Sequence, residues 1–191
     1  MNLSRSNALS NILSTKKLVL TAFMSAFMCI LSPLSISLPL TPVPISLGLF
    51  AVLICSYLLE PFSAFFCILI YIALGSLGLP VFSGFNGGIS RLIGPTGGFL
   101  IGFLFTVLIS SFFIHKFKAN YFIQFTAMIL SIIPCYILGS LWFSFQQRVA
   151  LGMAVKTCVL PFILIDSIKV IMALISGNLL IKHLNKSGIL V

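Results

Sequence analysis

The chain has 191 residues, of which 60% are hydrophobic and 7% are charged, and its formal net charge is +9. Soluble chains are about one quarter charged, so lipid is the expected solvent for most of this protein's surface. Secreted enzymes and coiled coils are excluded, and no nucleic-acid partner is expected, because the basic residues are scattered along the chain rather than gathered on one stripe.

Six apolar segments follow one another with short connections between them. A membrane helix needs about 20 mainly apolar residues, and these runs are continuous in Leu, Ile and Phe, whereas the strands of a membrane barrel would alternate. We therefore predict an all-α integral membrane protein whose residues 1–191 form one domain, a bundle of six helices. Residues 1–15 are expected to be a flexible cytoplasmic segment. The predicted spans are residues 18–34, 45–59, 62–79, 97–114, 121–145 and 159–181.

The basic residues predict how this bundle is oriented. With the amino terminus in the cytoplasm, seven basic residues fall inside and three outside, in agreement with the positive-inside rule. Both termini are therefore expected in the cytoplasm. The inner group is Arg5, Lys16, Lys17, Lys116, Lys118, Lys182 and Lys186, and the outer group is Arg91, Arg148 and Lys156.

The first span carries two small residues, Ala22 and Ala26, one helical turn apart. Such a pair gives a flat stripe that another helix can approach closely. By itself the pattern is weak, because packing within a bundle accounts for most pairs of this kind.

The outer connection that follows, residues 32–44, contains four prolines and is nevertheless apolar. Proline blocks helix formation and removes a backbone donor. We expect this proline-rich loop to pack on the bundle as a lid, since loops of this length in compact domains are commonly functional. The alternative is a plain connector held at the membrane interface.

The second unusual outer connection, residues 78–98, has glycine at seven of its 21 positions. Glycine lets the backbone approach another surface and adopt positive φ. The last residues of the segment begin a hydrophobic helix, whose free N–H groups and positive dipole end favour anions. Tight helix packing through small residues is an equally open explanation of these glycines.

The last span contains Asp166 and Lys169, the one acid and the one base predicted inside a span. Three residues apart on a helix, they share one face. Charges within a bilayer are costly and usually face the bundle interior for a functional reason. We therefore expect the pair to line an outward-facing pocket, with Arg91 of the glycine-rich loop as a second cation. A pair that only neutralises itself, and an Arg91 that is only solvated, are the alternatives.

Patterns typical of catalysis and of metal binding are missing from the sequence. The five cysteines lie in apolar runs without a C-x-x-C pair, and the two histidines have no second ligand in range, so no metal is expected. There is no phosphate-binding loop and no catalytic Ser/His/Asp set. Energy for uphill transport would therefore have to come from a partner.

Several of these segments together resemble the BioY family, the biotin-specific substrate-binding component of energy-coupling-factor transporters. The resemblance covers almost the full length. It is carried by Gly78-Leu-Pro-Val-Phe-Ser-Gly-Phe85 with Gly87 and Gly88, by Gly94-Pro-Thr-Gly-Gly98, by Thr41-Pro-Val-Pro44, and by Asp166 and Lys169 after Pro161-Phe162.

The resemblance implies a six-helix bundle in the bacterial inner membrane that captures biotin from outside. Delivery follows docking onto a transmembrane coupling protein with two cytoplasmic ATPases. Ala22 and Ala26 match the family's docking stripe. No cofactor is implied, because ATP is hydrolysed only by the partner subunits.

The resemblance also implies roles for the candidate binding residues. Asp166 would accept from a ureido N–H and Lys169 would donate to the ureido oxygen. Apolar side chains such as Val81 and Phe82 would meet the rings and the valeryl chain. The remaining candidates for substrate binding are Asn86, Gly87 and Gly88 of the glycine-rich loop, and Arg91, which is assigned to the biotin carboxylate from its charge alone.

Three other functions stay open from the sequence. A component of the same fold could bind another vitamin, such as thiamine or riboflavin. A small membrane enzyme acting on lipid would use Asp166 as general acid or base, although such chemistry usually requires a further His, Ser or metal cluster. A purely structural subunit would tolerate loss of both Asp166 and Lys169.

Overall fold

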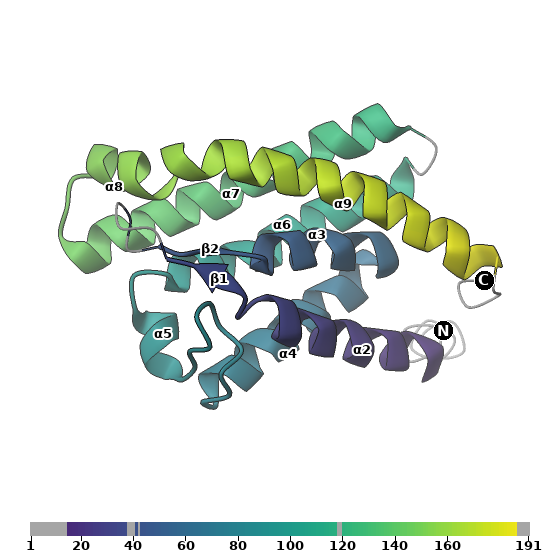
Figure 1. Ribbon diagram of the computed structural model, residues 1–191, viewed down its shortest axis with the longest axis horizontal. Helices are drawn as coiled ribbons and strands as arrows, with labels where there is room; N and C mark the ends of the chain where they lie inside the picture. Colours follow the sequence, from purple (N-terminus) through teal and green to yellow (C-terminus); the bar gives the residue numbers. More distant parts are fainter. Residues whose placement is uncertain (1–14, 38–40, 42, 118–119, 187–191) are drawn as a thin grey trace, which may run out of the picture.

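The computed structural model describes residues 15–37, 41, 43–117 and 120–186 of the chain. Most of them are helical, and a short antiparallel sheet pairs β1 (Ser35–Ile36) with β2 (Ile45–Ser46). The helices are α2 (Thr15–Leu31), α3 (Gly48–Leu58), α4 (Pro61–Ser76), α5 (Ile89–Ile93), α6 (Gly97–Lys116), α7 (Tyr121–Gln147), α8 (Leu151–Cys158) and α9 (Leu160–Lys186) (Figure 1).

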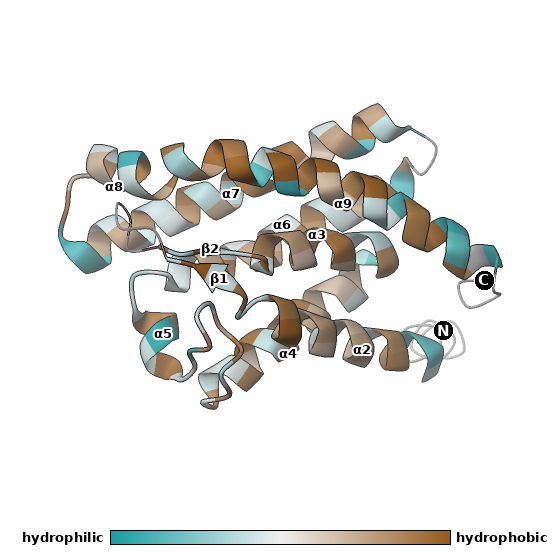
Figure 2. Ribbon diagram, viewed as in Figure 1, coloured by the Kyte–Doolittle hydropathy of each residue, from teal (hydrophilic) through white to brown (hydrophobic). Residues whose placement is uncertain are grey.

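The six predicted spans fall on α2, α3, α4, α6, α7 and α9. Three of these helices are long and apolar enough to cross a membrane, namely α6, α7 and residues Leu160–Leu184 of α9, whereas α3 and α4 are apolar but shorter. Figure 2 shows hydrophobic residues along much of α9 and hydrophilic ones toward its C-terminal end. The chain is therefore a helical membrane protein, and the count of six spans stays a prediction.

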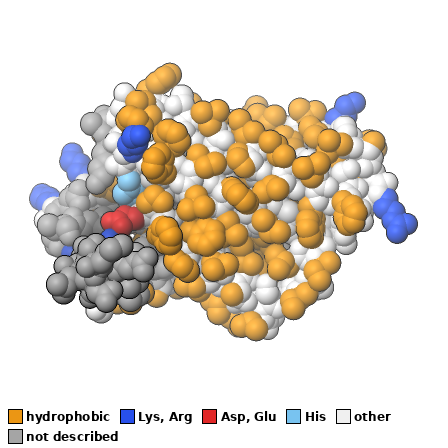
Figure 3. All heavy atoms as spheres, turned by 180° about the vertical axis from the view of Figure 1, so that it is seen from behind, with side chains coloured by type: hydrophobic (Ala, Val, Ile, Leu, Met, Phe, Trp, Pro, Cys, Tyr) orange, Lys and Arg blue, Asp and Glu red, His pale blue; other side chains and the backbone are white. Residues whose placement is uncertain are grey.

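The outer surface has the distribution of side chains that a bilayer requires. On the face in Figure 3, hydrophobic side chains cover the middle of the molecule, and Lys and Arg side chains lie toward its two ends. Many large apolar side chains on the outside are highly exposed, such as Phe23 at 65%, Leu164 at 71% and Phe145 at 82%. Such an exterior is stable only against lipid.

Three outer connections contain structure that the sequence did not predict. The predicted second span begins at Ile45, but Ile45 and Ser46 form β2 and the helix begins only at Gly48, because β2 pairs with β1 in the register Ser35↔Ser46. The proline-rich loop is therefore closed at its base by a hairpin, and its residues 38–40 and 42 lie outside the described residues. The glycine-rich loop contains α5, and α8 lies between the last two spans.

The two ends of the bundle differ in what they carry. The described chain begins and ends at the same end, while the hairpin, α5 and α8 lie at the opposite end (Figure 1). At the end with the termini, Lys17 of α2 forms an ion pair with Glu60, which precedes α4, at 2.8 Å. Residues 1–14, which hold most of the predicted cytoplasmic segment and Arg5, lie outside the described residues, as does Lys118.

Close packing of α6 on α7 depends on glycine. A Cβ on Gly102 would lie 2.7 Å from the Cα of Cys135, and a Cβ on Gly98 would lie 2.6 Å from the carbonyl oxygen of Leu138. Both contacts are shorter than real Cβ contacts and involve backbone atoms, which cannot easily move aside. Small residues at this interface allow the two backbones to approach closely, as is typical of membrane helices.

We expect Gly102→Ala to destabilise the protein by about 1–3 kcal/mol, because the added methyl group overpacks the α6–α7 interface. Gly152→Ala is the matched control, since a Cβ there meets nothing within 4 Å and alanine favours helix. Thermal unfolding in detergent measures both variants. Equal melting temperatures for the two would contradict the packing argument.

Candidate solute-binding pocket

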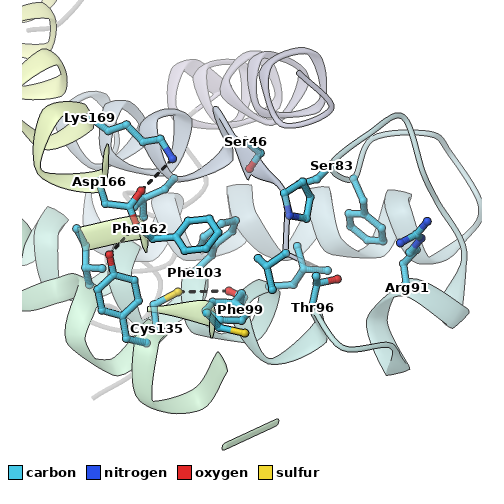
Figure 4. A pocket seen from close by; sticks show the side chains of 18 residues that line it. Ser46, Ser83, Arg91, Thr96, Phe99, Phe103, Cys135, Phe162, Asp166 and Lys169 are labelled. Atoms are coloured by element: carbon cyan, nitrogen blue, oxygen red, sulfur yellow. Dashed lines mark hydrogen bonds and ion pairs between the residues drawn. The ribbon is translucent and has the colours of Figure 1, made fainter. Parts of the chain in front are cut away.

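A cavity opens at the end of the bundle that carries the hairpin, α5 and α8 (Figure 4). Its empty volume is about 810 Å³ including the open mouth, and its walls come from the proline-rich loop, the glycine-rich loop, and α3, α6, α7, α8 and α9. Aromatic side chains form much of the lining: Phe82, Phe99, Phe103, Tyr136 and Phe162. Such a mainly apolar pocket with a few polar groups is typical of small-molecule sites.

The charged pair of α9 lies on the wall of this cavity. The Nζ of Lys169 donates to Oδ1 of Asp166 at 2.9 Å, and the two residues are 7% and 5% exposed. Their spacing of three residues puts them on one face of α9, so the carboxylate and the ammonium neutralise each other where lipid surrounds the bundle. Both residues line the same cavity in this structure, and their role in binding a ligand from the outer side stays a prediction.

Tyr136 of α7 is the third member of this cluster, and the sequence did not predict it. Its hydroxyl donates to Oδ2 of Asp166 at 2.7 Å, and its side chain also lines the cavity. The two carboxylate oxygens of Asp166 therefore each accept one hydrogen bond, one from an ammonium and one from a phenol. Four tyrosines occur in the chain, and no local signal tells which of them faces Asp166 from another helix.

Arg91 reaches the same cavity from α5. Figure 4 places its guanidinium at the far side of the pocket from Asp166 and Lys169. Nη2 of Arg91 donates to Oδ1 of Asn86 at 2.7 Å, while Nδ2 of Asn86 donates to the carbonyl oxygens of Ser83 and Gly84 at 2.9 and 3.1 Å. Asn86 lies outside the lining, so in this structure it holds the loop and orients Arg91.

The other candidates of the glycine-rich loop take different positions. Phe82 lines the cavity and packs edge-on against Tyr71, with ring centroids 5.5 Å apart. Val81 is buried in the core and is not part of the lining.

Gly87 and Gly88 also lie outside the lining. A Cβ on Gly87 would clash with the backbone of Leu79, and Gly88 has φ +94° and donates its N–H to the carbonyl oxygen of Gly75 at 2.7 Å. These glycines shape the loop.

The glycines at the start of α6 pack closely against neighbouring segments. A Cβ on Gly97 would clash with the carbonyl oxygen of Leu92, and one on Gly98 would clash with Trp142 of α7. The indole N–H of Trp142 donates to the carbonyl oxygen of Gly94 at 2.9 Å. Tight packing, one of the two explanations left open by the sequence, is therefore what Gly97 and Gly98 show here.

The predicted docking residues lie far from this pocket on the outside of α2. Ala22 and Ala26 are exposed, whereas Thr21, Met24, Ser25 and Met28 form the buried face of the helix. The small side chains therefore face away from the bundle, and packing within the bundle does not explain them.

A helical membrane protein whose few intramembrane charges line a cavity between its helices is a solute-binding membrane protein. Among the described residues, no group of three or more His, Cys, Asp or Glu is placed to hold a metal ion. The sequence profile of the BioY family matches residues 4–186. The chain belongs to this family.

Individual relatives agree with the family assignment. A biotin transporter BioY2 from Lactococcus lactis subsp. cremoris is 37% identical over 171 residues, which is 90% of this chain and 93% of the relative. A probable biotin transporter BioY from Pyrococcus horikoshii is 36% identical over 73% of this chain and 82% of the relative. The crystal structure of an S-component for biotin from an ECF-type ABC transporter matches with a TM-score of 0.82, 34% identity, and coverage of 90% of this chain and 94% of that one.

We expect Lys169→Met to lower the stability of the ligand-free protein by about 3–5 kcal/mol, because it leaves Asp166 as a buried charge without its cation. Replacing the whole pair, as in Asp166→Leu with Lys169→Met, is expected to restore most of that loss, since no buried charge remains. Thermal unfolding in detergent compares the two variants. A double variant less stable than the single one would contradict this account of the pair.

Proposed function

We propose that this protein takes up biotin as the substrate-binding component of an energy-coupling-factor transporter. It is a transport component and not an enzyme, as are the family and the structural relative to which it is similar. The observation that carries the proposal is the buried Asp166–Lys169 pair on the wall of a cavity that also receives Arg91. That arrangement offers one acceptor and two cations to a neutral polar ring with an anionic tail.

The pocket fits biotin group by group. The carboxylate of Asp166 accepts from a ureido N–H, and the ammonium of Lys169 keeps donors free for the ureido oxygen after bonding Asp166. The aromatic walls enclose the sulfur-containing ring and the valeryl chain. Because Arg91 lies across the cavity from the charged pair, its guanidinium is placed for the carboxylate at the other end of the ligand.

The proline-rich loop completes this pocket on its outer side. Val43 and Pro44 line the cavity together with Ser46 of β2, and Val43 packs in a second apolar cluster with Phe143, Ala154 and Phe162. The loop therefore acts as the lid, and opening it exposes the cavity to the side from which biotin enters.

Thiamine fits this pocket less well than biotin. Thiamine is a cation, and in this cavity it would meet two cationic side chains and one carboxylate, which is already bonded to Lys169. Competition between labelled biotin and unlabelled thiamine or riboflavin distinguishes the three ligands.

The proposal includes a topology and a set of partners. Six helices cross the bacterial inner membrane with both termini in the cytoplasm, which puts the pocket on the outer side. The exposed face of Ala22 and Ala26 on α2 docks onto a transmembrane coupling protein. Two ATPases bound to that protein hydrolyse ATP, and no cofactor is required in this chain.

We expect Asp166→Asn and Lys169→Ala each to weaken biotin binding by about 10- to 100-fold, because each removes a charge-assisted hydrogen bond to the ureido group. Isothermal titration of detergent-purified protein with biotin measures the effect. Glu60→Gln is the control, since Glu60 is the other acid and lies near the end with the termini, outside the pocket lining. Unchanged affinity in both pocket variants would refute the assignment of the site.

We expect Ala22→Trp to abolish biotin uptake while biotin affinity stays unchanged, because the large ring would separate α2 from the coupling protein. Uptake of radiolabelled biotin by cells that express the complete transporter measures the first effect, and titration of the isolated protein measures the second. Ile175→Trp, at an exposed apolar position of α9, controls for a tryptophan at the lipid surface. Normal uptake by the Ala22→Trp variant would remove the docking proposal.

A further inference from the structure

Tyr136 lines the cavity beside the charged pair, and the proposed function gives it no role. Its hydroxyl donates to Oδ2 of Asp166 at 2.7 Å, while Lys169 occupies Oδ1 at 2.9 Å. A tyrosine hydroxyl has one proton and two acceptor lone pairs. Because the proton is committed to the carboxylate, the oxygen of Tyr136 remains available only as an acceptor.

The polar groups at this end of the cavity then form a defined set. Asp166 accepts, Tyr136 accepts, and Lys169 donates with the protons that Asp166 does not use. Ser83 and Thr96 lie toward Arg91 in Figure 4, and the Sγ of Cys135 faces the carbonyl oxygen of Phe99 at 3.6 Å. Ser46 also lines the cavity, and its hydroxyl accepts from the N–H of Gly48 at 3.3 Å. The hydroxyl of Tyr136 is the one in the lining that is hydrogen-bonded to Asp166, so it can receive a second donor directly beside the carboxylate.

A cyclic urea carries two N–H donors and one carbonyl acceptor. Asp166 satisfies one N–H and Lys169 satisfies the carbonyl, which leaves the second N–H to be matched. Burying that N–H without a partner would cost the ligand the hydrogen bond that it makes to water.

We propose that Tyr136 accepts the second ureido N–H and is a specificity-determining residue of this pocket, an inference that rests on the proposed binding of biotin. Through its donated bond Tyr136 also fixes the orientation of the Asp166 carboxylate. Asp166, Lys169 and Tyr136 together thereby select an unsubstituted cyclic urea. They reject ligands whose second nitrogen cannot donate, because discrimination is strongest where a buried polar group is left unpaired.

Tyr136→Phe removes one hydroxyl and keeps the ring in place. We expect it to weaken biotin binding by about 10- to 100-fold, since the ligand N–H and one carboxylate oxygen both lose a partner. Tyr57→Phe is the matched control, because the hydroxyl of Tyr57 is buried, donates to Gln124 at 3.0 Å, and does not line the cavity. That variant should bind biotin with unchanged affinity.

The decisive measurement is a thermodynamic cycle that combines one change in the protein with one change in the ligand. The affinities of wild type and of Tyr136→Phe are measured by titration with biotin and with each of the two singly N-methylated biotins. In the wild type each methylation weakens binding. In Tyr136→Phe the penalty for one isomer should fall to less than about threefold, whereas the penalty for the other should remain, which a residue that only supports the fold would not produce.

The outcomes separate the two proposals. If wild-type protein binds no biotin, the proposed function fails and this inference fails with it. If it binds biotin but also binds one N-methyl isomer with equal affinity, the role of Tyr136 fails and biotin binding stands, and this result does not depend on any variant folding. If each N-methylation weakens binding by the same factor in Tyr136→Phe as in wild type, the role of Tyr136 is likewise overturned.

Discussion

A carboxylate and an ammonium held together inside an apolar bundle are the constraint on which the rest of this structure depends. Either charge alone would be expensive in lipid, and the two are tolerated because they neutralise each other and because the carboxylate also accepts a hydrogen bond from the neutral hydroxyl of Tyr136. The cluster is compensated in the ligand-free protein, yet it keeps unused acceptors and protons directed at a cavity. A polar ligand can therefore bind without the protein first exposing a bare charge.

The packing of the helices determines where these groups meet. Tyr136 belongs to α7 and Asp166 to α9, and the distance between their oxygens is set by how closely α7 lies to its neighbours. One helical turn after Gly98, Gly102 lets α6 approach Cys135, the residue next to Tyr136. The glycines of α6 thus position a pocket-lining residue of the neighbouring helix, although Gly98 and Gly102 lie outside the lining themselves.

Hydrophobic runs in the sequence predicted the six helices of the bundle in order, and the Asp166–Lys169 pair was predicted because a charged pair inside a span is rare. Tyr136 could not be found, since the packing of α7 near α9 brings together two residues that are 30 positions apart in the sequence. The hairpin was missed because two-residue strands leave no periodic signal. Asn86 was predicted as a binding residue from its place in the loop, but its amide holds Arg91, which only the three-dimensional fold reveals.

A row of buried contacts connects the pocket to the C-terminal end of α2. Ser32, just beyond the end of α2, shares a hydrogen bond of 2.6 Å with the hydroxyl of Tyr71 in α4. The ring of Tyr71 packs edge-on against Phe82, and Phe82 lines the cavity. The side chains of Ser32 and Tyr71 therefore link the end of α2, the helix that carries Ala22 and Ala26, to Phe82 in the pocket wall. Because buried side chains are close-packed, a shift of Phe82 would disturb Tyr71 and, through its hydrogen bond, the residue that follows α2.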